Sequence, residues 1–248
     1  MLEYEAMRLY GKRPVLERLK TAPNTVRSIC LQEGVDVPEI RQAAQAAGVR
    51  LEMKPKGLFL RMAGDVHAQG ILAEVKEFRY ADLEDLLKPQ ARRTAAALFF
   101  LDRITDPQNL GAILRTLACL GGFAVVLPRH DSVEVTEAVL RVACGAENYL
   151  PVVQVTNLVQ ACERAKKAGY WIAGATVTGG TPLHEADWPT PLGIVLGSEG
   201  SGIRPGLEKE LELKLTLPMP GAALSYNVAT SAGLIAYEIT RRRLQHSS

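Results

Sequence analysis

The sequence predicts an α/β protein whose C-terminal part contains a parallel sheet. From residue 97 onward, short apolar segments alternate with helical patterns of about 10 to 15 residues, and such crossovers join parallel strands. Polar segments containing glycine follow several of the apolar ones. Ligands bind at the carboxyl ends of the strands in sheets of this kind. The sequence therefore predicts both the layered fold and the edge of the sheet that would hold a site.

The elements of this part follow in order. Apolar segments predict strands at 98–101, 124–127, 150–153, 170–175, 193–196 and 213–217. Helical spacing predicts helices at 108–120, 134–142, 158–168, 205–211 and 227–242.

The first eighty residues form a smaller α/β pattern of their own. We expect strands at 26–31, 49–53 and 70–75, and helices at 14–20 and 37–47. Pro38 suits a first helical turn, and Gly48 suits the position after a helix end. Residues 81–96 are charged and contain Pro89, which is typical of a linker. We therefore predict domains at 1–80 and 97–248, joined by a linker at 81–96.

Composition places the chain among intracellular proteins. Hydrophobic residues make up 47% and charged residues 23%. No run approaches the roughly 20 apolar residues of a membrane span, and the acidic start lacks the order of a secretory signal. Neither the cysteines nor the histidines have the spacing of a metal site or of a disulfide framework. They are Cys30, Cys119, Cys144, Cys162, His67, His130, His184 and His246. We expect a cytoplasmic location, no metal and no membrane.

The charge distribution gives weak support for a nucleic-acid partner. Residues 1–80 hold 13 Lys+Arg against 10 Asp+Glu, whereas residues 97–248 hold 13 against 14. A solvated surface explains this bias about as well as a basic face would.

The first polar segment runs from Asn109 to Thr116. Asp106 or Asn109 could cap the helix that begins there, and Arg115 could be an ordinary surface side chain. Alternatively, Arg115 faces an anionic or electron-rich substrate group, since its guanidinium is permanently charged and presents a planar fork to phosphate.

The second polar segment, 197–202, reads Gly-Ser-Glu-Gly-Ser-Gly. Its glycine spacing is not that of the dinucleotide fingerprint, and the chain has no phosphate-binding loop ending in Gly-Lys-Ser/Thr. Residues without side chains allow a ligand to approach the backbone closely, and Glu199 adds one carboxylate. The segment could equally be a structural turn in which Glu199 stabilises a helix N-terminus.

The third polar segment runs from Leu217 to Asn227. Ser225 is a good helix N-cap candidate, and Met219 could serve only for packing. Ser225 and Asn227 could instead present a hydroxyl and an amide that orient a ribose hydroxyl.

Together, the three segments resemble, in order and spacing, the motifs of the SpoU (TrmH-type) RNA ribose 2′-O-methyltransferases of the SPOUT superfamily, over about residues 97–242. The resemblance implies a deep C-terminal trefoil knot, S-adenosylmethionine as cofactor and a homodimer that completes the site. By this resemblance, the active-site residues are Asn109, Arg115, Glu199, Ser225 and Asn227. It also implies that the cofactor is held around Thr176, Leu196, Gly197, Gly202, Leu217, Met219 and Tyr226.

The N-terminal part resembles the L30e-like substrate-binding domain of the ribosomal-RNA branch of the family. Tyr10-Gly11 and His67 to Ile71 carry that likeness, while the inserted Ala68 and the pair Lys12-Arg13 depart from it. Tyr226 also stands where the family commonly has leucine. We expect Lys12 and Arg13 to contact RNA, with Lys54, Lys56 and Arg61 as the alternative surface.

The resemblance implies methylation of a ribose 2′-hydroxyl in 23S ribosomal RNA. Arg115 would bind the adjacent phosphate and stabilise the developing oxyanion, because a deprotonated arginine is costly. Ser225 and Asn109 would orient the hydroxyl. Two alternatives are a methyltransferase for transfer RNA and a non-catalytic RNA-binding protein on the same fold.

Overall fold

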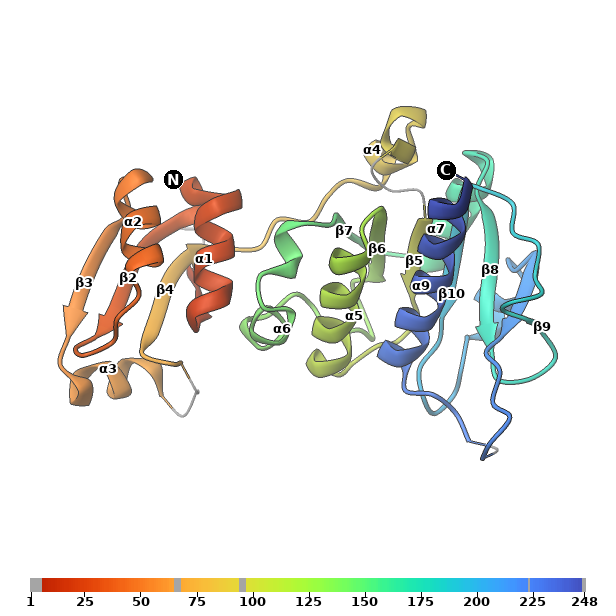
Figure 1. Ribbon diagram of the computed structural model, residues 1–248. Coiled ribbons are helices and arrows are strands. Elements are labelled where there is room, and N and C mark those ends of the chain that lie inside the picture. Colours follow the sequence, from red (N-terminus) through yellow and green to blue (C-terminus); the bar gives the residue numbers. More distant parts are fainter. Residues whose placement is uncertain (1–5, 65–67, 94–96, 223, 247–248) are drawn as a thin grey trace. The chain divides into compact units, whose positions relative to one another are not determined.

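The computed structural model describes residues 6–64, 68–93, 97–222 and 224–246 (Figure 1). His67 and the last three residues of the expected linker, 94–96, lie outside this part of the chain. Two compact units form: Met1–Arg79 with Val135–Tyr149, and Tyr80–Glu134 with Leu150–Ser248. The domain bounds at 80 and 97 stay a prediction.

The first unit contains a four-stranded sheet in the order β1-β4-β2-β3. Strand β4 is antiparallel to both of its neighbours, and β2 pairs with β3 in parallel. The strands are β1 (Ala6–Tyr10), β2 (Val26–Gln32), β3 (Arg50–Lys54) and β4 (Ile71–Lys76). Three of these four strands follow the sequence prediction, and β1 is an addition at the sheet edge.

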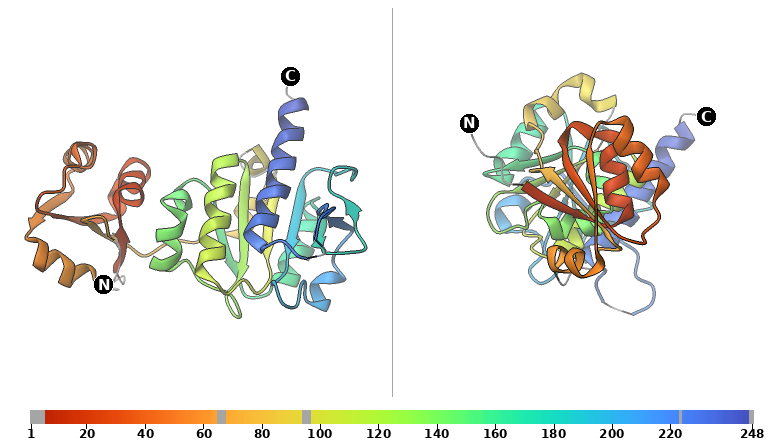
Figure 2. Two further views of the ribbon diagram at one scale, coloured as in Figure 1. Left: turned by 60° about the horizontal axis from the view of Figure 1, so that its bottom comes forward. Right: turned by 90° about the vertical axis from the view of Figure 1, so that its left-hand side faces the viewer.

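Helices cover both faces of this sheet. Figure 2 shows α1 (Lys12–Thr21) and α2 (Pro38–Ala46) on one face and α3 (Lys56–Ala63) on the other. The unit also includes α6 (Glu137–Ala143). Gly11 has φ +90° and its backbone N–H donates to the Ile71 carbonyl at 3.0 Å. The segments around Tyr10 and Ile71 therefore meet at the start of α1.

The second unit contains a seven-stranded parallel sheet in the order β7-β6-β5-β10-β8-β11-β9. Its longer strands are apolar because both faces are covered, and all five residues of β5 and of β10 are buried. The strands are β5 (Ala97–Leu101), β6 (Phe123–Pro128), β7 (Val152–Val155), β8 (Trp171–Thr176), β9 (Thr181–Pro182), β10 (Leu192–Leu196) and β11 (Leu213–Thr216). The predicted parallel sheet is confirmed.

Helices pack on both faces of the second sheet as well. The helices α5 (Pro107–Leu120) and α9 (Val228–His246) lie side by side (Figure 1). The helix α7 (Leu158–Lys167) packs against β6, β8 and α8 (Pro205–Glu208), and α4 (Leu83–Leu87) packs against β7. Buried Leu98, Phe100 and Val195 join the sheet to α7 in one apolar cluster.

Parallel pairing fixes where the three polar segments meet. They follow β5, β10 and β11, and the carboxyl ends of parallel strands lie at one edge of a sheet. Only β8 separates β10 from β11 in this sheet. The knot that the resemblance implies stays a prediction. Among the described helices, none has the length and apolar character that crossing a membrane requires.

Candidate active site

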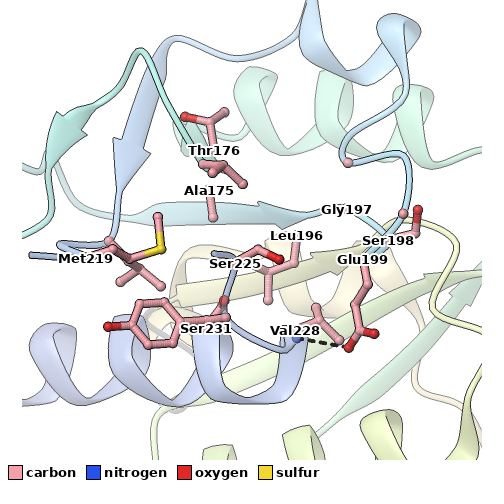
Figure 3. A pocket seen from close by; sticks show the side chains of 15 residues that line it. Ala175, Thr176, Leu196, Gly197, Ser198, Glu199, Met219, Ser225, Val228 and Ser231 are labelled. Atoms are coloured by element: carbon pink, nitrogen blue, oxygen red, sulfur yellow. Dashed lines mark hydrogen bonds between the residues drawn. The ribbon is translucent and has the colours of Figure 1, made fainter. Parts of the chain in front are cut away.

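A pocket lies at the carboxyl edge of the second sheet. Its lining comes from the ends of β8 and β10, from the loops after β8, β10 and β11, and from the first turn of α9 (Figure 3). The lining residues are Ala175, Thr176, Val177, Leu196, Gly197, Ser198, Glu199, Gly200, Gly202, Leu217, Met219, Ser225, Tyr226, Val228 and Ser231. All seven residues expected to hold the cofactor are among them.

The loop from Gly197 to Gly202 is folded tightly on itself. The Gly202 backbone N–H donates to the Ser198 carbonyl at 2.9 Å. A Cβ atom at Gly197 would lie 2.1 Å from the Gly202 carbonyl carbon, so no side chain fits there. Gly202 itself has φ +64°, which glycine adopts readily. The glycines therefore let two stretches of backbone touch beside the pocket.

Asn109, Glu199 and Asn227 form one hydrogen-bonded group. The Asn227 Nδ2 atom donates to Asn109 Oδ1 at 2.8 Å and to Glu199 Oε1 at 2.5 Å. Asn109 Nδ2 also donates to Glu199 Oε1, at 3.3 Å, as does the Val228 backbone N–H, at 3.4 Å. Three of the five expected active-site side chains, one from each polar segment, are thus in direct contact.

Asn227 also caps α9. Its Oδ1 atom accepts from the backbone N–H groups of Ala229 at 2.9 Å and Thr230 at 3.4 Å. The expectation that Ser225 could be the N-cap is wrong, because α9 begins at Val228 and Ser225 lies two residues before the capping position. Ser225 lines the pocket instead. At α5, Asp106 is the cap, and its Oδ1 accepts from the Gln108 backbone N–H at 2.8 Å.

A buried carboxylate anchors the chain just after the glycine loop. Asp102 follows β5 and is fully buried. It accepts from the Arg204 backbone N–H at 2.8 Å and from Arg204 Nε at 2.6 Å. Arg103 Nη2 donates to the Gly202 carbonyl at 3.1 Å. The end of β5 is therefore joined to the C-terminal end of the loop that follows β10.

A second pocket adjoins the first. Four residues line both pockets: Ser198, Glu199, Gly200 and Val228. The remaining lining of the second pocket comes from the segment between β5 and α5 and from the first turn of α5: Arg103, Ile104, Thr105, Asp106 and Asn109. The four shared residues form a wall between the two pockets, which we call the shared wall.

The other expected site residues lie elsewhere. Arg115 is exposed on α5, about 9 Å along the helix from Asn109, and is not among the described residues lining either pocket. Lys12 and Arg13 are exposed at the start of α1, where Lys12 Nζ forms an ion pair with Glu39. The structure thus groups Asn109, Glu199, Ser225 and Asn227 at the pocket without Arg115.

Several lining residues have no motif that would reveal them. Ala175 and Val177 flank Thr176 and are apolar, and Ser231 lies one helical turn after Asn227. For Ser231, that helical spacing from Asn227 was the one available indication. Asp102 and Arg204 are 102 residues apart, so no local pattern predicts their contact.

Replacing Asn227 with aspartate should separate its two roles. Aspartate caps a helix as well as asparagine does, but it cannot donate to Asn109 and would place a second carboxylate against Glu199. We expect Asn227→Asp to lower the free energy of unfolding by about 0.5–1.5 kcal/mol at pH 7, because the contacts lie at the surface. Chemical denaturation at pH 7 measures this loss.

Asn157 provides the matched control. It caps α7 with the same geometry, accepting from Val159 N–H at 2.9 Å and Gln160 N–H at 3.3 Å. Asn157→Asp should change the free energy of unfolding by a few tenths of a kcal/mol at pH 7. Equal losses in the two variants would show that the contact with Glu199 contributes nothing.

The chemistry of the first pocket fits S-adenosylmethionine. Glu199 is the only charged side chain among the described lining residues, so the pocket offers an anion to a sulfonium cation and no arginine or lysine to a phosphate. Leu196, Leu217 and Met219 supply apolar surface for an aromatic base. Tight glycine packing leaves backbone groups within reach of a ligand.

Comparisons with known proteins agree with this geometry. Residues 96–237 match the model of the SpoU rRNA Methylase family, and residues 8–81 match that for RNA 2′-O ribose methyltransferase substrate binding. The uncharacterized tRNA/rRNA methyltransferase slr0955 of Synechocystis sp. is 37% identical over 82% of this chain, which spans 53% of that relative. The 23S rRNA (guanosine-2′-O-)-methyltransferase RlmB of Coxiella burnetii is 34% identical, with 95% of each chain covered.

The fold also matches solved structures. The SpoU methyltransferase AviRb from Streptomyces viridochromogenes, in complex with AdoMet, aligns with a TM-score of 0.79 at 21% identity. The alignment covers 96% of this chain and 91% of that one. The chain therefore belongs to the SpoU rRNA methylase family: it is an RNA ribose 2′-O-methyltransferase that uses S-adenosylmethionine.

Proposed function

We propose that this enzyme methylates a ribose 2′-hydroxyl in 23S ribosomal RNA, in the cytoplasm and as a homodimer. The observation that carries the proposal is the contact of Asn109, Glu199 and Asn227 at the wall of a pocket that suits a sulfonium cofactor. The full-length likeness to a relative named for 23S ribosomal RNA, and the match of residues 8–81 to an RNA substrate-binding model, favour this target.

The chain's own residues have distinct roles in the proposed reaction. S-adenosylmethionine supplies an activated methyl group on a good leaving group, so the transfer needs no metal. Thr176, Leu196, Gly197, Gly202, Leu217, Met219 and Tyr226 would hold it. Asn109 and Ser225 orient the attacking 2′-hydroxyl, while Glu199 and Asn227 fix the position of Asn109. Arg115 binds the neighbouring phosphate and stabilises the oxyanion.

A homodimer would bring Arg115 of one chain to the pocket of the other, whose described lining does not include Arg115 within a single chain. Exposed apolar side chains follow one face of α9: Leu234 is 40% exposed, Tyr237 59% and Leu244 65%. A second copy that covered this face would bury them, and α5, which carries Arg115, packs beside α9. Sedimentation equilibrium should give twice the 27.0 kDa of the chain.

The decisive experiment is methyl transfer from labelled S-adenosylmethionine to total RNA. We expect the label in 23S ribosomal RNA, at a single nucleotide whose 2′-O-methyl group blocks alkaline cleavage. Label confined to transfer RNA would replace the proposed target with the alternative one. RNA binding without any label would leave the non-catalytic interpretation.

Lys12 and Arg13 are proposed to contact RNA phosphates at the start of α1. The ion pair between Lys12 and Glu39 lies at the surface, so it costs little to exchange for a phosphate. In the double alanine variant, the slope of log affinity against log salt should fall in magnitude by about 1.4–1.8. Filter binding over a range of salt concentrations measures it.

Glu39→Gln is the matched control, because it removes the competing carboxylate and should strengthen RNA binding at low salt. An unchanged slope and affinity in the double variant would place the RNA elsewhere, at Lys54, Lys56 and Arg61.

A further inference from the structure

Arg103 combines a strained backbone with a charged side chain at the second pocket. It follows β5 by two residues and has φ +58°, a conformation that glycine adopts readily and that L side chains rarely adopt. Glycine would remove that strain, yet an arginine occupies the position. The guanidinium is therefore the feature of Arg103 that needs an explanation.

The Arg103 side chain is held in place at the pocket. Its Nη2 atom donates to the Gly202 carbonyl at 3.1 Å, and its Nε lies 3.6 Å from Asp102 Oδ2. The side chain is 31% exposed, whereas Asp102 is fully buried and also pairs with Arg204. One buried carboxylate thus faces two guanidinium groups. Together, Asp102, Arg103 and Arg204 carry a net charge of +1.

The lining of the second pocket carries one cation, Arg103, and two carboxylates, Asp106 and Glu199, so an anion there would bind at Arg103. Arg103 is the only lysine or arginine among the described residues that line this pocket. The two carboxylates of the lining already accept hydrogen bonds: Asp106 from the first turn of α5, and Glu199 from Asn109, Asn227 and Val228. Arginine presents a planar, permanently charged fork that matches phosphate oxygens.

We propose that the second pocket is the RNA side of the active site, and that Arg103 binds an RNA backbone phosphate there. This inference rests on the proposed function. The cofactor pocket and the second pocket meet at the shared wall, so RNA in the second pocket approaches the cofactor from the side on which Asn109 lies. Arg103 is then a binding residue for RNA, distinct from the residues that hold the cofactor.

The variant Arg103→Gly separates this role from a structural one. Glycine relieves the backbone strain but also removes the hydrogen bond to Gly202 and one of the two guanidinium partners of Asp102, so the melting temperature should change little. Affinity for S-adenosylmethionine should stay within about threefold, since Arg103 is not among the lining of the cofactor pocket. Affinity for a 23S ribosomal RNA transcript should fall roughly tenfold, and the salt slope should fall in magnitude by about 0.7–0.9.

Two further variants serve as controls. Arg103→Lys keeps the charge and should restore most of the salt slope. Asp131 lies in the loop after β6, is exposed and also has φ +58°. Asp131→Gly therefore relieves a backbone strain of the same kind and should leave RNA binding unchanged.

Three results would overturn the inference. A lower melting temperature with an unchanged salt slope would make Arg103 an anchor of the glycine loop. A large loss of cofactor affinity would assign it to the cofactor. Weaker RNA binding at an unchanged slope would indicate a contact with a base instead of a phosphate.

RNA binding is measured without turnover, which keeps the two proposals apart. A wild-type enzyme that binds the transcript but transfers no methyl group refutes the proposed function, while the salt slopes still decide the role of Arg103. A wild-type enzyme that binds no RNA refutes both.

Discussion

Replacing Gly197 with alanine is expected to abolish cofactor binding. The new Cβ would lie 2.1 Å from the Gly202 carbonyl carbon and 2.3 Å from the Ile203 backbone nitrogen. These are backbone atoms, so no side chain can rotate away, and the loop must open. We expect affinity for S-adenosylmethionine to fall at least 100-fold and the free energy of unfolding to fall by about 1–3 kcal/mol. Titration calorimetry and denaturant unfolding measure the two effects.

Gly200 provides a control within the same loop. A Cβ there would meet nothing within 4 Å, and Gly200 has no positive φ, so Gly200→Ala should leave both quantities nearly unchanged. If Gly197→Ala bound the cofactor normally, the loop would not be its binding site.

Replacing Arg115 with alanine is expected to lower the rate of methyl transfer by about 10²–10³-fold, the usual cost of removing one oxyanion donor. Affinity for S-adenosylmethionine should stay within a few-fold, because Arg115 is not among the described residues around the cofactor pocket. Arg115→Lys should recover only part of the rate, since it keeps the charge but loses the fork. Single-turnover kinetics measure the rate of methyl transfer. A rate near that of the wild type would remove Arg115 from the mechanism.

Mixing the two inactive variants tests whether the dimer shares its sites. A dimer of one Arg115→Ala chain and one Gly197→Ala chain has one intact cofactor pocket and one Arg115, on different subunits. If Arg115 serves the partner's pocket, random exchange should restore about a quarter of the wild-type rate. If each chain uses its own Arg115, the mixture stays inactive.

Strand and helix order follows from the sequence because burial on both faces gives the strands of the second unit apolar runs. The sequence does not predict helix α3, because most of its apolar side chains are not buried. Its apolar residues are nearly continuous, and only Phe59 and Ala63 are buried, while Leu58, Leu60 and Met62 are partly exposed. The run therefore lacks the spacing that marks an amphipathic helix. The strand β9 has two residues, too few for any periodic pattern.

At the site, the sequence supplies the side chains but not all of their partners. The motif order predicted that Asn109, Glu199 and Asn227 belong together, and parallel strands bring them to one edge. Which residue caps α9 could not be decided, since Ser225 and Asn227 are equally good caps by type. The contact between Asp102 and Arg204 joins distant parts of the chain, and Asp102 looks in the sequence like an exposed loop residue.

The shared wall couples the binding of the two ligands. Glu199 and its neighbours face both pockets, so any rearrangement of the wall by one ligand changes the free energy of binding of the other. Such coupling is reciprocal: the factor by which S-adenosylmethionine alters RNA affinity equals the factor by which RNA alters affinity for S-adenosylmethionine. If S-adenosylmethionine binds beside Glu199, its sulfonium charge is lost on methyl transfer and its attraction to that carboxylate ends. The coupling through the shared wall would then favour bound RNA less, and the methylated RNA would leave more readily.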